Sequence, residues 1–145
     1  MRFMFVPAAL LSLAACSQPA EQQPAPANEA ANETVQAAVP SMEGEWDVTA
    51  LGGRPLQQVF PMRATFAEDQ MTVRSECLTF VWDYTQERNI VAFKPVSSGG
   101  CGRNHTTNEN EIERAMKGAN IALFAEGGRE VQLSGNGGTA TLTRR

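Results

Sequence analysis

Histidine, lysine and cysteine are scarce in this chain. Its 145 residues include one histidine (His105), two lysines (Lys94 and Lys117) and three cysteines. A Ser-His or Cys-His catalytic arrangement would have to use His105, and no Gly-x-Ser-x-Gly elbow accompanies it. We therefore expect no catalytic residues, and we classify the chain as non-enzymatic.

Runs of basic residues are also lacking. The chain carries a formal net charge of −4, which becomes −5 without residues 1–15, because these contain Arg2 and no acid. An acidic surface without a basic patch disfavours nucleic acid as a partner. The glycine-rich stretch "SSGGCGRN" (97–104) lacks the Gly-Lys pair of a phosphate-binding loop, so no cofactor is expected.

No apolar run is long enough to cross a membrane as a helix. The longest, "FMFVPAALLSLAA" (3–15), has thirteen residues, whereas about 20 are needed. With Arg2 before it, this run predicts a signal peptide over residues 1–15. The Leu-Ala-Ala-Cys sequence at 13–16 resembles a bacterial lipobox; an ordinary secretory signal with an incidental cysteine is the alternative.

The lipobox resemblance implies that Cys16 carries a diacylglyceryl anchor, with palmitate-like acyl chains that hold the protein to a membrane. Ser17 follows where an inner-membrane retention signal would have Asp. We therefore expect a lipoprotein of the bacterial cell envelope, on the outer membrane and facing the periplasm.

Residues 16–41 are rich in Ala, Pro, Gln, Glu and Asn and poor in large apolar side chains. This composition predicts a disordered tether that follows the lipidated cysteine. The remaining stretch, 42–145, has the length of one domain with its own core.

Alternating apolar residues predict antiparallel strands in this domain. In "GEWDVTAL", Trp46 and Val48 share one face, with Ala50 as a third candidate for it. "MRATFAEDQMTVRS" predicts a hairpin that turns at "AEDQ". The next strand alternates four side chains on its expected core face: Leu78, Phe80, Trp82 and Tyr84.

One helix is predicted after residue 105. Thr106 and Glu109 form a Thr-x-x-Glu capping box, and Gly118 suits the position just beyond the helix end. The stripe expected to face the sheet consists of Ile112, Ala115, Met116 and Ala119. Three strands follow. The prediction is an α+β domain with an antiparallel, strongly twisted, partly closed sheet and one covering helix, in the order strands, helix, three-strand meander.

Cys77 and Cys101 form the pair that remains once Cys16 carries a lipid. In an oxidising compartment they are expected first as a disulfide. Two alternatives stay open: a pair of free thiols, or a metal site that uses both cysteines and His105. The metal site is the weakest alternative, because the chain has no second histidine and no Cys-x-x-Cys motif, and no metal is predicted.

The aromatic residues of the strands have two interpretations. Trp46, Phe80, Trp82 and Tyr84, with Phe93 beside them, either fill the core or line a cavity for a small apolar ligand. Aromatic residues at alternating strand positions are typical of a core.

The domain resembles the META domain of HslJ-like lipoproteins of the bacterial envelope. The resemblance rests on "GEWDVTALGGRPL", on the positions of the two cysteines, on the helix start and on the closing "VQLSGNGGTATLTR". "SECLTF" and "SSGGC" depart from the family pattern around the cysteines. The resemblance implies a role in stress tolerance or outer-membrane homeostasis, with an unidentified envelope protein as a candidate partner.

A Gly-x-Trp opening is also similar to lipocalin-like barrels and to lipoprotein inhibitors of metalloproteases. These families imply a fuller barrel that binds a small apolar ligand, or a periplasmic protease inhibitor. A helix between two groups of strands favours the META resemblance.

Overall fold

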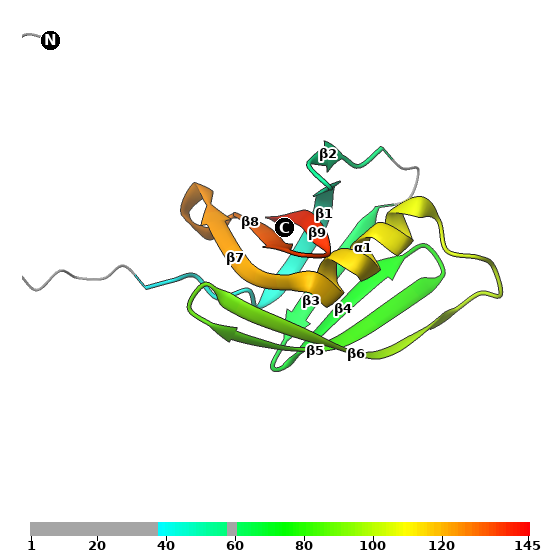
Figure 1. Ribbon diagram of the computed structural model, residues 1–145, viewed down its shortest axis with the longest axis horizontal. Helices are drawn as coiled ribbons and strands as arrows, with labels where there is room; N and C mark the ends of the chain where they lie inside the picture. The colour runs from blue at the N-terminus through cyan, green and yellow to red at the C-terminus, as the bar shows by residue number, and fades with distance from the viewer. Residues whose placement is uncertain (1–37, 58–60) are drawn as a thin grey trace, which may run out of the picture. The chain divides into compact units, whose positions relative to one another are not determined.

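The computed structural model describes residues 38–57 and 61–145 of the chain (Figure 1). In chain order the strands before the helix are β1 (Gly44–Leu51), β2 (Arg54–Pro55), β3 (Met62–Ala67), β4 (Gln70–Ser75), β5 (Leu78–Glu87) and β6 (Ile90–Gly100). The helix α1 (Thr107–Gly118) leads into β7 (Ala119–Ala125), a short 3-10 turn η1 (Glu126–Gly128), β8 (Glu130–Gly135) and β9 (Gly138–Arg144).

The sheet closes into an antiparallel barrel. Each long strand pairs with the next one along the chain, and β9 returns to pair with β1, so eight strands of the described residues form the ring. The short β2 pairs antiparallel with the end of β1. The junction between β6 and β7 is narrow, with Ile90 opposite Ile121 as its one register pair. A backbone hydrogen bond from Ala122 N to Asn89 O lies beside it.

The predicted antiparallel sheet, single helix and closing meander are confirmed, and the sheet closes further than predicted. Closure depends on the pairing of β1 with β9, whose partners are about 90 residues apart, for example Val48 with Leu142. Strand periodicity carries no information on such a distant pairing.

Apolar side chains at alternating strand positions fill the barrel interior, as the sequence predicts. Buried side chains alternate with exposed or half-buried ones along β3, β4 and most of β5. In β1 the alternation changes phase, because a bulge at Thr49 shifts the register between Val48 and Ala50. As a result Leu51 is buried and Ala50 is half-buried, so the suggestion that Ala50 extends the inward face was wrong.

The helix α1 begins at the predicted capping box and packs its predicted stripe against the barrel. Ile112, Ala115 and Met116 are buried, and the helix contacts β1, β6, β8 and β9. Gly118 is the last helical residue rather than the residue beyond the end. A Cβ atom there would overlap the backbone of Gly137, so this glycine permits the helix end to approach the β8–β9 turn.

Candidate functional site

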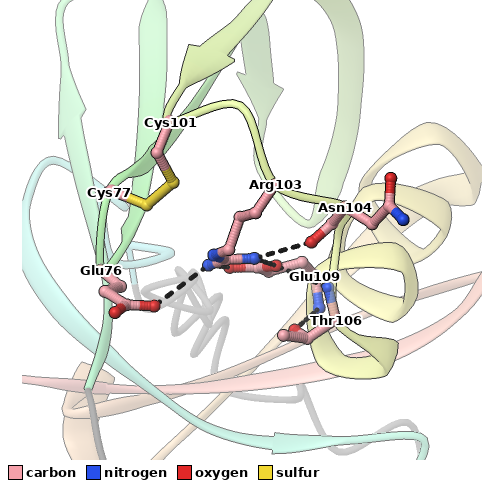
Figure 2. Close-up of a disulfide and its surroundings, with 7 residues drawn as sticks. All are labelled: Glu76, Cys77, Cys101, Arg103, Asn104, Thr106 and Glu109. Carbon is pink, nitrogen blue, oxygen red and sulfur yellow. Dashed lines mark hydrogen bonds and ion pairs between the residues drawn. A yellow bond between two sulfur atoms is a disulfide. The ribbon is translucent and has the colours of Figure 1, made fainter.

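The described cysteines form a disulfide that ties β5 to the loop before the helix (Figure 2). Cys77 stands directly before β5, Cys101 directly follows β6, and their Cα atoms are 5.6 Å apart. Gly100 is required beside them, since its φ is +144° and a Cβ atom would overlap the Cys77 carbonyl. The disulfide alternative is therefore confirmed. The metal site considered from the sequence needs both sulfurs as free ligands, and they are bonded to each other.

A buried carboxylate lies next to the disulfide. The side chain of Glu109 is 1% exposed, and Arg103 binds it through two parallel hydrogen bonds of 2.8 Å and 2.7 Å. The backbone N–H of Thr106 donates to the same carboxylate at 2.7 Å, and the Thr106 hydroxyl accepts from the Glu109 N–H at 3.3 Å. Figure 2 shows this network between the loop and the first helical turn.

This arrangement keeps the carboxylate ionised. The hydrogen bonds from Arg103 lower the pKa of Glu109 from 4.5 to about 2, against the opposing effect of burial, with smaller contributions from Thr106 and Ser75. The hydrogen bond to Glu109 likewise raises the pKa of Arg103. With its oxygens held by fixed donors, Glu109 anchors the loop to the helix.

Sequence reasoning found only half of this cluster. The capping box located Thr106 and Glu109, whereas no sequence pattern singled out Arg103 within the glycine-rich stretch 97–104. The available signal was an arginine six residues before the capping glutamate, in a loop whose start is fixed by a cysteine. Arg103 also reaches Glu76 at 3.3 Å, which links the loop to the residue before Cys77.

The side chain of His105 is half-buried. Its ring meets the Phe80 ring edge-on with centroids 5.2 Å apart, and its Nδ1 lies 3.8 Å from a carboxylate oxygen of Glu113. In the described part of the chain, no group of three or more histidine, cysteine or acidic side chains is placed to hold a metal ion.

The four aromatic residues weighed as ligand-lining positions all belong to the core. Trp46 is fully buried, and Phe80 and Trp82 are each 1% exposed. Phe80 and Trp82 stack with ring centroids 5.8 Å apart, while Tyr84 meets Phe66 edge-on at 5.1 Å. The rings therefore contact one another inside the barrel, although Phe80 and Trp82 also border a surface hollow of about 280 Å³.

Trp46 is held at both ends. Its indole N–H donates to the Met42 carbonyl at 2.7 Å, and the Arg144 guanidinium lies 4.3 Å from the ring centroid. Arg144 also donates to the carbonyls of Ser41 and Glu43, so the segment before β1 is fastened to β9.

The predicted signal peptide, Cys16 and the greater part of the predicted tether lie outside the described residues. Among the helices that are described, none is long and apolar enough to cross a membrane.

In the described residues, the fold is an antiparallel barrel of eight strands that contains one internal disulfide and has one helix between β6 and β7. This defines the structural class of the protein. Comparison with protein-family models, with curated proteins and with solved structures found no match to this chain.

Proposed function

We propose that this protein is a non-enzymatic lipoprotein of the bacterial envelope, with a META-like barrel tethered to the outer membrane through Cys16. The role implied by the resemblance is stress tolerance or outer-membrane homeostasis. The observation that carries the proposal is the Cys77–Cys101 disulfide, because such bonds persist in oxidising compartments such as the periplasm.

The position of the helix supports the META-like assignment. α1 lies between six preceding strands and the closing meander, which is the order that the resemblance implies. Ring closure is equally consistent with a lipocalin-like barrel, but the interior of this barrel is occupied by its own aromatic and aliphatic side chains. We therefore place the functional surface on the outside of the barrel.

Replacing Cys16 with Ser tests the anchor. The unaltered protein is expected in the membrane fraction, and the C16S variant is expected to leave it, since the acyl chains supply most of the membrane affinity. C77S, which keeps Cys16 and removes one of the two disulfide sulfurs, is the matched control and should stay with the membrane. If C16S remains fully membrane-bound, the lipoprotein assignment is wrong.

Binding of a small apolar ligand inside the barrel is the second candidate. It requires a ligand to displace side chains packed around the buried rings of Trp46 and Trp82, so binding should shift or quench tryptophan fluorescence. A flat response to a panel of lipids and apolar compounds excludes this candidate. A protease inhibitor would instead reduce the activity of secreted metalloproteases when mixed with them.

A further inference from the structure

A hollow of about 660 Å³ lies on the outer face of the barrel over β1, β3 and β4. Arg63 and Thr65 of β3 and Thr72 and Arg74 of β4 line it, and Arg145, which is paired with acidic side chains, lies at its border. These side chains alternate with buried ones along both strands, so they point away from the core.

The hollow sets two arginines against each other. Arg63 and Arg74 are directly opposite in the β3–β4 register, and Thr65 and Thr72 form another directly opposed pair on the same face. Directly opposed side chains on a sheet have Cβ atoms about 5 Å apart, and like charges in that position repel. The register therefore places two arginine side chains next to each other on the outer face, beside two side chains with hydroxyl groups.

The acidic groups near Arg63 are shared with other cations. Asp47 lies 3.9 Å from the Nε of Arg63, and its other oxygen lies 3.6 Å from Arg145. Arg145 also approaches Glu45 at 3.5 Å. The contact that Arg63 makes is the longest of these three, so its charge is only weakly compensated.

Arg74 has no such compensation. Glu76, at the rim of the same hollow, is paired with Arg103 at 3.3 Å. Within residues 38–57 and 61–145, no acidic side chain lies within 4.0 Å of the Arg74 guanidinium. An exposed, uncompensated arginine facing a second arginine is an unusual arrangement in a chain of net negative charge.

We propose that Arg63 and Arg74, with the hydroxyls of Thr65 and Thr72, bind a compact oxyanion group, either a phosphate or a carboxylate. Each guanidinium offers a planar fork of N–H donors that suits such an anion. One anion between the two forks also relieves their mutual repulsion. This site is independent of the lipid anchor and holds whether or not Cys16 is acylated.

The surroundings of the site restrict the ligand further. The carboxylates of Glu45 and Glu76 border the hollow, and they repel a second negative charge nearby. They also accept hydrogen bonds. The site therefore fits a ligand with a single oxyanion flanked by hydroxyl or ammonium donors, and it disfavours an extended polyanion.

Titration of the ¹⁵N-labelled full chain at constant ionic strength tests the proposal. Inorganic phosphate is one arm and lactate, which has one carboxylate beside a hydroxyl, is the other, with the arginine Nε–Hε signals recorded. Saturable shifts of Arg63 and Arg74 are expected in at least one arm, and the arm that responds identifies phosphate or carboxylate as the preferred group. No saturable shift in either arm, or equal shifts at Arg129 on the β7–β8 connection, would overturn the proposal.

Substitutions separate binding from folding. Arg74→Gln is expected to weaken the observed binding at least about tenfold, and Arg63→Gln provides an independent second variant. Arg129→Gln, an exposed arginine on another part of the barrel, is the matched control and should bind as the unaltered chain does. Without anion, R74Q should melt at the same temperature as the unaltered chain or higher, because a repulsion is removed. Unchanged binding by both R74Q and R63Q refutes the site.

Discussion

The buried Glu109 carboxylate is expected to make the free energy of unfolding of the domain fall at low pH. Its pKa is about 2 in the folded chain, against 4.5 for an unperturbed glutamate. A carboxyl whose pKa is lowered by folding stabilises the fold above its unfolded pKa, and that stability is lost as the pH falls toward the folded pKa. For Glu109 the lowering corresponds to roughly 3 kcal/mol, present above about pH 5 and lost between pH 5 and 2.

The substitution Glu109→Gln removes this pH dependence. It removes the bidentate partner of Arg103, whose side chain is 30% exposed, and leaves only the longer contact with Glu76, so we expect a loss of about 2–3 kcal/mol at pH 7. Urea unfolding followed by tryptophan fluorescence, with the disulfide intact, measures the difference. The gap between the unaltered chain and E109Q should narrow to under about 1 kcal/mol at pH 2.

Glu113→Gln is the matched control on the same helix. Glu113 is paired with Lys117 at 2.9 Å on the surface, where such pairs contribute about 0.5 kcal/mol or less. Its removal should lower stability by no more than that amount. If E109Q destabilises the domain equally at pH 7 and pH 2, or no more than E113Q does, the assignment of Glu109 as the acid-sensitive anchor is wrong.

Two further predictions concern the connections around the helix. Reducing the Cys77–Cys101 disulfide should lower the free energy of unfolding by about 3–4 kcal/mol, because the bond closes a loop across a sequence separation of 24. Urea unfolding with and without reductant measures the difference. An unchanged midpoint of the unfolding curve would contradict this prediction. Gly118→Ala should destabilise the domain by about 1–3 kcal/mol despite the better helix propensity of alanine, since its Cβ atom would overlap the Gly137 backbone. A more stable G118A in thermal unfolding would show that the β8–β9 turn moves away without cost.

Local sequence patterns predicted the strands and the helix start well. Phe80 and Trp82 alternate on the core face of one continuous strand, and the Thr106–Glu109 capping box sits where the helix begins. Both features depend on residues a few positions apart. The alternating pattern and the helix cap can therefore be predicted from a few neighbouring residues.

What the sequence did not predict depends on distant contacts. The bulge at Thr49 follows from the pairing of β1 with β9, and it moves Ala50 off the inward face. The Arg103–Glu109 pair joins the helix to the loop that the Cys77–Cys101 disulfide ties to the residue before β5, a connection between residues far apart in the sequence. The opposed arginines of the outer hollow appear only once the register of β3 and β4 is known.

Intact mass spectrometry of the protein extracted from bacterial membranes tests the central claim most directly. We predict a chain that begins at Cys16, carries the added mass of a diacylglyceryl group and its acyl chains, and lacks the two hydrogens removed by the Cys77–Cys101 disulfide. A chain without added lipid mass, or one with two free thiols under non-reducing conditions, would contradict the account of a lipid-anchored, disulfide-linked barrel.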